Sequence, residues 1–411
     1  MKILILASYF RPEIAASLYL FDNIYEKFSQ RGFHMSVYTP IPCRGISEKQ
    51  RLLYKKTLKK ESLYDGKMNI FRFSLMRERK NPLQRAFRYF ISCFIQLYYA
   101  SKDKSDVLFV ASTPPIQGAM AACVKKITHI PIVYNLQDIF PDSLVSTGLA
   151  SKNSFLWKIG RKIENFTYAN ADKIIVISEG FKQNIMAKGV PENKIEVVYN
   201  WVDEQAVVRV PRENNILFER YQLDPSKFYI TYCGNIGMTQ NMDLLLDIAQ
   251  DLSFIVDLHF VLIGDGAYRK NVEQKIKELQ IANISLLPFQ PYEDISHVFS
   301  LGDIGLVISK PGVGENSVPS KTWSIMSAEQ AIIANFDENE LKNIIEKNHC
   351  GIFTKAGDKK ALSDAILYLY KNREICSMMG KNGRNYILKN LTKEIGASKY
   401  ADVIESVCQK K

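Results

Sequence analysis

Short apolar runs alternate with amphipathic stretches along almost the whole chain, and this alternation restricts the fold more than any other feature of the sequence. Short runs rich in Val, Ile and Leu are typical of buried parallel strands, and helical periodicity fills the stretches between them. In the first half we expect strands at Lys2–Ala7, Met35–Thr39, Asn69–Phe73, Val107–Ala111, Ile132–Asn135, Lys173–Ser178 and Lys194–Asn200. This order of elements predicts an α/β fold with a doubly wound parallel sheet.

The alternation is interrupted once, from Val202 to Lys227, where the chain is polar and contains Pro211 and Pro225. It then resumes, with strands expected at Tyr229–Cys233, Asp257–Ile263, Ile284–Pro288, Ile304–Ser309, Ala331–Ala334 and Gly351–Phe353. Two further helices, at about 359–371 and 392–409, are expected to close the chain. The sequence thus predicts two Rossmann-like domains with a cleft between them, in which ligands bind beyond the carboxyl ends of the strands.

Two uncharged segments have to be considered as membrane spans, and neither fits that role. The first covers 18 residues, from Val107 to Val124, but contains Pro114, Pro115 and several polar residues. We expect a buried strand there, followed by a turn and a helix that begins at the prolines. The second, Tyr89–Ser101, has 13 residues. As a helix it would be about 20 Å long, which is too short for a hydrocarbon core of ~30 Å.

Positive charge is concentrated in one segment of the chain. The whole sequence has 54 Lys and Arg against 43 Asp and Glu, a net charge of +11, and residues 44–104 alone hold 16 basic and 5 acidic residues. The remainder is therefore neutral, so the excess indicates a localised anionic partner rather than general solubility.

The same segment contains an apolar helical face. It is formed by Leu83, Phe87, Phe90, Ile91, Phe94, Ile95 and Tyr98. This face either packs on the sheet or acts together with the upstream lysines at 55, 56, 59 and 60 as a peripheral surface for an anionic membrane.

Cysteine usage and the first residues indicate a reducing compartment. The seven scattered cysteines include no CxxC pair and are poor material for a disulfide framework or a zinc site. The chain opens with MKILILASYF, a strand pattern without the cleavage region of a signal peptide. We therefore expect a cytoplasmic protein, peripheral on the inner face of the cell membrane.

Glycine-containing turns follow the first two expected strands of the second half. One lies in Tyr-Cys-Gly-Asn-Ile-Gly-Met-Thr-Gln, residues 232–240, and the other is Gly-Asp-Gly, residues 264–266. Glycines at such turns let backbone N–H groups approach an anion at a helix N-terminus. Each can equally be a tight turn that binds nothing.

A lysine stands at the start of an expected helix, in Val-Pro-Ser-Lys-Thr-Trp at residues 318–323. Ser320 is a candidate helix cap, which puts Lys321 in the first helical turn. A cation at the positive end of a helix dipole is unfavourable unless an anion lies nearby, so we expect a phosphate there. The alternative is an exposed surface lysine.

In the first half, Asp138 follows the strand that ends near Asn135. It stands at the carboxyl end of that strand, where a Rossmann sheet presents polar groups to its crevice. The alternative is a cap or an Asx-turn. Arg11 and Glu13, in the first strand–helix turn, face the same edge and are expected to pair with each other.

Several common catalytic signatures are absent from the sequence. No two aspartates are spaced i, i+2, so there is no DxD metal–nucleotide motif, and the five histidines show no ligand spacing. No GxSxG elbow occurs either. We therefore expect neither a metal nor a cofactor.

Taken in order, these motifs resemble those of the family 4 retaining glycosyltransferases, which have the GT-B fold. The resemblance is greatest to the O-antigen and capsule branch, which includes N-acetyl-L-fucosamine transferases. It covers nearly the whole chain, in Tyr-Phe-Arg-Pro-Glu at 9–13, Ser-Thr-Pro-Pro at 112–115, Leu-Gln-Asp-Ile-Phe-Pro-Asp at 136–142, Tyr-Asn-Trp-Val-Asp at 199–203, Gly-Asn-Ile-Gly at 234–237 with Gln240, Gly-Asp-Gly at 264–266 and Val-Pro-Ser-Lys at 318–321.

The resemblance implies an acceptor domain at residues 1–203, a nucleotide-sugar domain at 204–391, and a final helix at 392–411 that returns to the first domain. It also implies that Lys321 supplies positive charge to the donor phosphates and that Asp138 lies on the acceptor side. The other expected donor-binding residues are Gly234, Asn235, Gln240, Asp265 and Ser320.

Two positions depart from the family pattern. Ala15-Ala16 stand where many members have a glycine pair. The E-x7-E signature is missing, because its positions fall near Asn316 and Ser324. Glu315, one residue from the first of these positions, is the candidate for contacts to sugar and ribose hydroxyls.

The resemblance implies that a sugar is moved, with retention, from a UDP-sugar to an undecaprenyl-diphosphate-linked acceptor, with no nucleic acid involved. Front-face attack, in which the leaving phosphate takes the acceptor proton, requires no dedicated nucleophile. Two alternatives stay open. A nucleotide-sugar epimerase would release its product without an acceptor, and a non-catalytic basic adaptor would neither transfer nor hydrolyse a donor.

Activity is predicted to be independent of divalent metal. Without a DxD pair, the sequence offers no two carboxylates for a cation beside the diphosphate. Sugar transfer by the purified protein after dialysis against EDTA should match that of the untreated sample. A loss of activity in EDTA that Mg²⁺ or Mn²⁺ restores would contradict this expectation.

Overall fold

The structure is a computed structural model that describes residues 1–13, 18–78, 81–146, 151–152, 154–314 and 318–409. The chain divides into unit 1, Met1–Tyr199 with Glu394–Lys411, and unit 2, Asn200–Lys393. The first boundary lies between Tyr199 and Asn200, whereas we expected it after residue 203. Glu204 belongs to unit 2 under either division. Its carboxylate accepts a hydrogen bond from the Lys393 N–H, and its carbonyl accepts one from Arg384.

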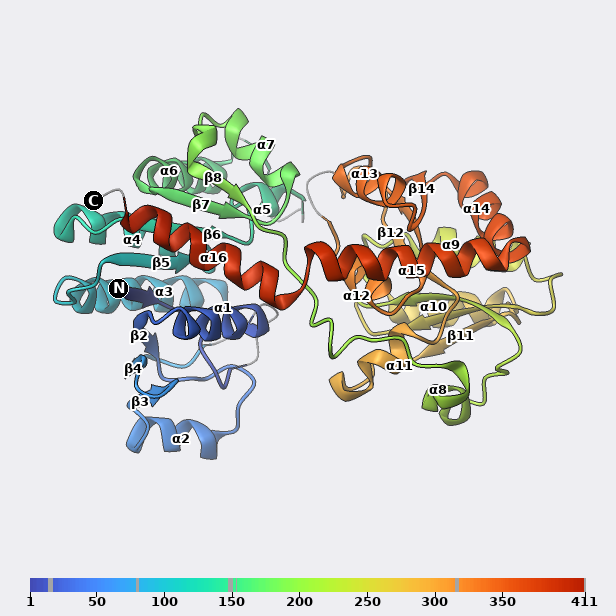
Figure 1. Ribbon diagram of the computed structural model, residues 1–411, viewed down its shortest axis with the longest axis horizontal. Coiled ribbons are helices and arrows are strands. Elements are labelled where there is room, and N and C mark those ends of the chain that lie inside the picture. The colour runs from blue at the N-terminus through green and yellow to red at the C-terminus, as the bar shows by residue number, and fades with distance from the viewer. Residues whose placement is uncertain (14–17, 79–80, 147–150, 153, 315–317, 410–411) are drawn as a thin grey trace. The chain divides into compact units, whose positions relative to one another are not determined.

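In the described part of unit 1, eight strands form one sheet in the order β3-β4-β2-β1-β5-β6-β7-β8 (Figure 1). The strands are β1 (Lys2–Leu6), β2 (His34–Pro40), β3 (Lys60–Leu63), β4 (Met68–Phe73), β5 (Val107–Ala111), β6 (Ile132–Leu136), β7 (Lys173–Val176) and β8 (Ile195–Val197). Neighbouring strands are parallel except for β3 and β4. The predicted doubly wound parallel sheet is confirmed.

Helices cover both faces of this sheet. They are α1 (Leu18–Gln30), α2 (Glu48–Lys56), α3 (Pro82–Ala100), α4 (Ile116–Thr128), α5 (Asp142–Ser146), α6 (Phe155–Asn170), α7 (Glu179–Ala187) and α16 (Lys393–Cys408). On one face, Phe28 of α1 and Tyr400 of α16 pack edge-on against Phe109. On the other, Cys93 of α3 shares a core with Leu108. Figure 1 shows α1 and α16 in front of the sheet, with α3 and α4 behind it.

Unit 2 has a second parallel sheet, with six strands in its described part, in the order β11-β10-β9-β12-β13-β14. These are β9 (Phe228–Cys233), β10 (Leu258–Ile263), β11 (Ile284–Leu287), β12 (Ile304–Ile308), β13 (Ala331–Phe336) and β14 (Gly351–Lys355). The helices are α8 (Ile216–Arg220), α9 (Met242–Asp251), α10 (Arg269–Glu278), α11 (Ile295–Phe299), α12 (Lys321–Ser327), α13 (Glu340–Lys347), α14 (Lys359–Lys371) and α15 (Arg373–Asn390). Each expected strand of this half is present, and the central strands β9, β12 and β13 are completely buried apolar runs.

Two elements were not expected from the sequence. Strand β3 is short and polar, and it pairs antiparallel with β4 across a turn at residues 64–67. Helix α15 contains Gly380 and Gly383, which lower helix propensity. A Cβ atom at Gly380 would lie 2.0 Å from the Glu329 carbonyl oxygen, so the glycine is required by close packing. Three helices therefore close the chain where we expected two.

The uncharged segment at 107–124 folds as predicted. It forms β5 and then α4, with Pro115 at the N-cap position of the helix. Among the described residues, no helix combines the length and the apolar character needed to cross a bilayer.

Helix α3 is oriented with its polar side inward. Arg88, Ser92 and Gln96 are almost completely buried, whereas Phe90 and Phe94 are exposed. Of the two alternatives for the apolar face, packing on the sheet is therefore excluded for Phe90 and Phe94. The inner face donates hydrogen bonds to backbone carbonyls at the ends of strands, which apolar side chains could not do.

Helix α16 is joined to the rest of unit 1 by polar contacts as well as by packing. The hydroxyl of Tyr400 donates to the side-chain oxygen of Asn135 at 3.0 Å. On the surface, Lys27 pairs with Glu394 at 2.6 Å and Arg31 with Asp402 at 3.0 Å. The buried hydroxyl is expected to contribute more to stability than either exposed ion pair.

The variant Tyr400→Phe tests this contribution. Loss of a buried hydrogen bond should lower the free energy of unfolding by about 1–2 kcal/mol, which urea denaturation will measure. The control is Tyr368→Phe, at an exposed tyrosine of α14, for which we expect a change within ~0.5 kcal/mol. Equal effects of the two substitutions would show that the Tyr400 hydroxyl does not hold α16.

Candidate functional site

The turns after β9 and β10 are packed against each other at the carboxyl edge of the sheet in unit 2. The Gly234 N–H donates to the Ile263 carbonyl at 2.9 Å, and the Ile236 N–H donates to the Asp265 carbonyl at 2.8 Å. Gly264 has a φ of 149°, and a Cβ atom there would come within 1.9 Å of the Gly234 carbonyl oxygen. Only glycine fits this position, so the sequence at the turn is dictated by backbone contact.

Three side chains hold the first turn in shape. Gln240 accepts a hydrogen bond from the Gly237 N–H at 3.1 Å and another, at 3.5 Å, from the amide of Asn235. The Tyr232 hydroxyl donates to the Asn235 carbonyl at 2.6 Å. The structure thus brings together Gly234, Asn235 and Gln240, and the Asn235 side chain is exposed at the edge. Their binding of a donor stays a prediction.

Three further predicted positions lie in or beside these turns. Asp265 is exposed, and its carboxylate accepts a hydrogen bond from the Gly266 N–H at 2.8 Å. Ser320 stands at the N-cap position of α12, but its side chain makes no capping hydrogen bond and its backbone is already helical. The expectation that Ser320 caps the helix is therefore wrong. Glu315 lies outside the described residues.

Lys321 is placed against an aromatic ring at this edge. Its Nζ lies 3.7 Å from the centroid of the Tyr232 ring, and a Cβ atom on Gly234 would lie 3.9 Å from the same nitrogen. Desolvation lowers the pKa of Lys321 from 10.5 to about 7. A cation–π contact offsets part of the cost of removing the ammonium group from water. The alternative of a solvated surface lysine does not fit this environment.

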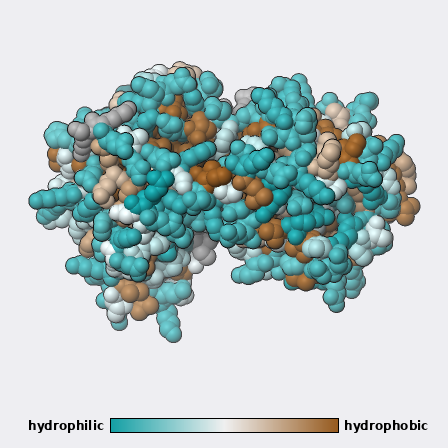
Figure 2. All heavy atoms as spheres, viewed as in Figure 1, coloured by the Kyte–Doolittle hydropathy of each residue, from teal (hydrophilic) through white to brown (hydrophobic). Residues whose placement is uncertain are grey.

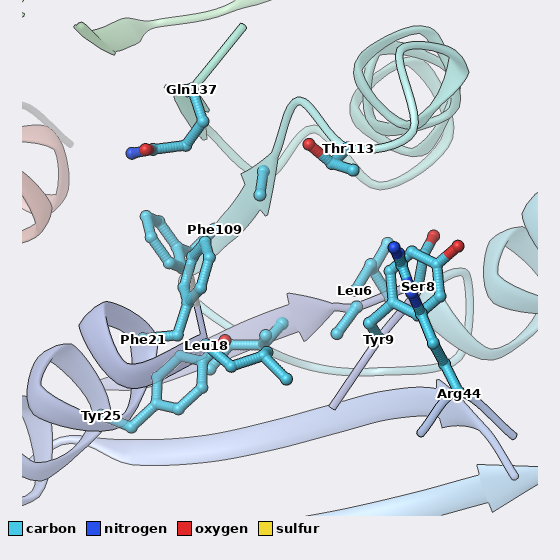
Figure 3. Close-up of a pocket in the computed structure, with 13 residues that line it drawn as sticks. Leu6, Ser8, Tyr9, Leu18, Phe21, Tyr25, Arg44, Phe109, Thr113 and Gln137 are labelled. Carbon is cyan, nitrogen blue, oxygen red and sulfur yellow. The ribbon is translucent and has the colours of Figure 1, made fainter. Parts of the chain in front are cut away.

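Unit 1 contains a pocket of about 370 Å³ at the carboxyl edge of its sheet. Figure 3 shows aromatic side chains on one side, including Phe21 and Phe109, and Tyr9 together with Arg44 on the other. Gln137, from the turn after β6, adds an amide to the lining. The pocket therefore combines an apolar wall with a cationic and hydrogen-bonding rim.

Glu13 fixes the backbone beside this rim. Its carboxylate is buried and accepts hydrogen bonds from the N–H groups of Phe10, Cys43 and Arg44 at 3.2, 2.9 and 3.1 Å. Burial raises the pKa of Glu13, and the three N–H donors oppose that rise. The expected pairing of Glu13 with Arg11 is wrong, because backbone donors occupy the carboxylate.

Arg11 instead pairs with Asp22 at 3.0 Å and donates to the Tyr64 hydroxyl at 2.7 Å. These are contacts between distant parts of the sequence, and no local pattern indicates them. The sequence therefore missed both the pocket rim and the carboxylate that positions it.

Asp138 stands apart from the pocket. It is exposed, and one carboxylate oxygen accepts a hydrogen bond from the Ser143 hydroxyl at 3.0 Å. The surrounding protein removes part of its hydration and raises its pKa. Asp138 borders a separate void of about 10 Å³ with Phe140, whereas its neighbour Gln137 lines the larger pocket. A role for Asp138 on the acceptor side stays a prediction.

Potential metal ligands are dispersed in the part of the chain that the structure describes. No group of three or more His, Cys, Asp or Glu side chains there is arranged to hold a metal ion. Seven cysteines are free, and four of them are buried.

Both halves of the chain match known family models. Residues 20–206 match the model described as glycosyltransferase family 4, and residues 213–386 match the model described as glycosyl transferases group 1. A relative from Pseudomonas aeruginosa, named "Probable glycosyltransferase WbjE", is 25% identical over 303 residues, which is 72% of this chain and 74% of the relative.

Solved structures share the fold over the full length. HepE from Anabaena, crystallised in complex with UDP, superposes with a TM-score of 0.74 at 15% identity, covering 99% of this chain and all of HepE. WaaG, a glycosyltransferase involved in lipopolysaccharide biosynthesis, gives 0.67 at 13% identity, covering 98% of this chain and 99% of WaaG.

The matches in both halves and the shared two-domain architecture agree with the motif order along the sequence. The chain is a glycosyltransferase of the GT-B fold, in which a family 4 domain is followed by a group 1 domain.

Proposed function

We propose that the protein transfers a sugar, with retention of configuration, from a UDP-sugar to a lipid-linked saccharide during synthesis of a bacterial surface polysaccharide. The observation that carries this proposal is the desolvated ammonium group of Lys321 beside the glycine turns of unit 2. A cation held in this way is suited to a diphosphate, because the anion would replace the interactions with water that the ammonium group has lost.

The donor assignment has further support from a structural neighbour. HepE has been crystallised with UDP and with UDP-glucose, and its fold superposes on this chain along the whole length. The family resemblance points to N-acetyl-L-fucosamine as the transferred sugar.

The chemistry proposed for the donor side is leaving-group stabilisation. The bond between the sugar C1 and the β-phosphate oxygen breaks as the acceptor oxygen forms a bond to C1 on the same face. The acceptor proton passes to the departing phosphate oxygen, so no side chain has to act as a nucleophile. Lys321 stabilises the charge that builds up on the diphosphate.

The acceptor assignment is supported by the pocket in unit 1. Its apolar wall suits the carbon face of a saccharide or lipid, and Arg44 suits the diphosphate that links the two. WaaG, which acts in lipopolysaccharide biosynthesis, shares the fold. The epimerase and adaptor alternatives are not favoured, because both halves match glycosyltransferase models.

One experiment tests donor, acceptor and stereochemistry together. The purified protein is incubated with a panel of UDP-sugars and an undecaprenyl-diphosphate-linked monosaccharide, and the products are separated and examined by NMR. We expect one donor to give a disaccharide with the anomeric configuration of that donor. Interconversion of the nucleotide sugar without an acceptor would identify an epimerase, and an inverted product would exclude the proposed mechanism.

Lys321→Ala is predicted to lower kcat/KM for transfer by at least ~100-fold, because charge on the leaving group is no longer stabilised. The melting temperature should not fall, since a desolvated cation is removed from the fold. The control is Lys360→Ala, at an exposed lysine of α14 that should leave both measurements unchanged. Activity of Lys321→Ala within about threefold of wild type would exclude the role.

Affinity for UDP is predicted to decrease as the pH rises above about 7, the pKa of Lys321 in the free protein. The diphosphate binds the protonated lysine, so the apparent Kd should rise by up to ~tenfold per pH unit above this pH. UDP itself is almost fully ionised there, because its last phosphate pKa is about 6. Calorimetry between pH 7 and 9 measures the trend.

The matched variant is Lys321→Arg, whose guanidinium stays protonated throughout this range. Its Kd for UDP should not change with pH, whatever its absolute value. A pH-independent Kd for the wild-type protein between pH 7 and 9 would show that Lys321 does not titrate in response to the nucleotide.

A further inference from the structure

Helix α3 presents a continuous aromatic stripe to the surface of unit 1. The stripe consists of Leu83, Phe87, Phe90, Phe94 and Tyr98, whose exposed fractions lie between 49% and 81%. Their spacing of three and four residues places them on one side of the helix. Five such side chains, each about half exposed, present roughly 500 Å² of apolar surface, as much as the largest patch on an ordinary monomer.

The orientation of the stripe is fixed by the opposite side of the helix. Gln96 donates to the carbonyls of Ala7 and Tyr38 at 2.9 and 3.1 Å, and its own side-chain oxygen accepts from Gln117 at 2.7 Å. Arg88 donates to the Met76 carbonyl at 2.9 Å. Rotation of α3 to bury its aromatic residues would break these hydrogen bonds and expose the buried side chains of Arg88 and Gln96, although the Tyr38 carbonyl would keep the Ala7 N–H as a donor. The stripe therefore cannot turn inward.

The surroundings of the stripe are cationic. Helix α3 contains no acidic residue. Its exposed Arg85 pairs with Glu78 at 3.1 Å, and the Lys102 Nζ lies 4.0 Å from the centroid of the Tyr98 ring. The segment 44–104, which includes α3, carries 16 basic and 5 acidic residues, and Lys55, Lys56 and Lys59 are exposed within it. Aromatic side chains beside lysines and arginines are typical of surfaces that bind anionic lipid. By contrast, the face of unit 1 that carries α1 and α16 is largely hydrophilic in Figure 2.

The stripe is also linked to the pocket of unit 1. Tyr89 of α3 lies one position from Phe90, and its hydroxyl is 2.5 Å from that of Tyr9, which lines the pocket. Arg44, on the same rim, lies over the Tyr9 ring at 5.3 Å. A helix seated in a lipid surface would thus hold the pocket close to that surface.

We propose that the aromatic stripe of α3 inserts into the headgroup region of an anionic lipid monolayer, with lysines of the basic segment 44–104 in contact with lipid phosphates. The proposal deepens the proposed function, on which it rests, by naming the surface from which the lipid-linked acceptor is taken. The occupant is a lipid surface rather than a second protein, because the cationic surroundings complement anionic headgroups.

The test measures vesicle binding by the full chain. Sedimentation with phosphatidylglycerol vesicles is compared for wild type and for the triple variant Phe87→Gln, Phe90→Gln, Phe94→Gln. We expect wild type to bind at low salt, to be partly released near ~0.5 M salt, where charges are screened, and to bind neutral phosphatidylcholine vesicles weakly. The triple variant should bind phosphatidylglycerol at least fivefold more weakly.

Two matched variants separate the apolar and the charged contributions. Phe254→Gln with Val256→Gln changes exposed apolar residues in unit 2, which are 74% and 83% exposed, and should bind vesicles as wild type does. Neutralising Lys55, Lys56 and Lys59 with glutamine should weaken binding and reduce its salt dependence.

In a separate variant, Phe90→Trp, the tryptophan emission should shift to shorter wavelength when vesicles are added.

Insertion is excluded if wild type ignores the anionic vesicles, if the triple variant binds them equally well, or if the emission of Phe90→Trp does not move. Self-association that the triple variant abolishes, without vesicle binding, would assign the stripe to a second copy of this chain. Transfer to a short-chain, water-soluble acceptor should be unaffected by the triple variant, whereas transfer to an acceptor in vesicles should fall. Absence of transfer to both acceptors by wild type would reject the proposed function but leave vesicle binding as a separate result.

Discussion

The carboxyl edges of the two parallel sheets impose the constraint on which both candidate sites depend. Strands that end beneath helices and turns leave carbonyl groups that need donors once they are shielded from water. In unit 1 the donors include side chains, since Gln117 serves the Leu6 carbonyl and Gln96 serves those of Ala7 and Tyr38. In unit 2 the Arg269 side chain donates to the Gly264 and Leu287 carbonyls, and the turn after β9 is also bonded directly to the turn after β10. This direct contact between the two turns requires glycine at position 264.

Side-chain donors at the edge of unit 1 also determine how α3 is oriented. A helix that supplies glutamine and arginine to the interior cannot bury its aromatic residues on the same side, so these face outward. The exposed stripe is thus a consequence of polar requirements in the interior. A surface that would be an aggregation hazard on an ordinary protein is retained here because the opposite face of the helix has no alternative arrangement.

The sequence predicts those parts of the fold that depend on local composition. Buried apolar runs located the strands of both sheets except β3, and the glycine turns together with Lys321 located the polar edge of unit 2. The sequence did not predict α15, since Gly380 is explained only by contact with the Glu329 carbonyl and Gly383 only by contact with Met326, both distant in sequence. It revealed the two faces of α3 but not which one packs inward, because helical periodicity separates a polar from an apolar face without indicating which of them contacts the sheet. Glu13 was misassigned for a related reason, as its partners include Cys43 and Arg44 on another loop.

Lys321 shows how a binding group can carry an energetic cost when its ligand is absent. Its pKa of about 7, against 10.5 for an unperturbed lysine, means that the unfolded chain binds more protons than the native protein between these two values. The free energy of unfolding therefore rises as the pH increases through this range, and below pH 7 the protonated lysine costs the free protein on the order of a few kcal/mol. The Tyr232 ring offsets only part of this cost. An anion beside the ammonium group offsets the rest of this free-energy cost. The stabilisation becomes larger as negative charge develops on a departing phosphate. The desolvation that weakens the fold at Lys321 is thus the same property that would make the residue effective on a leaving group.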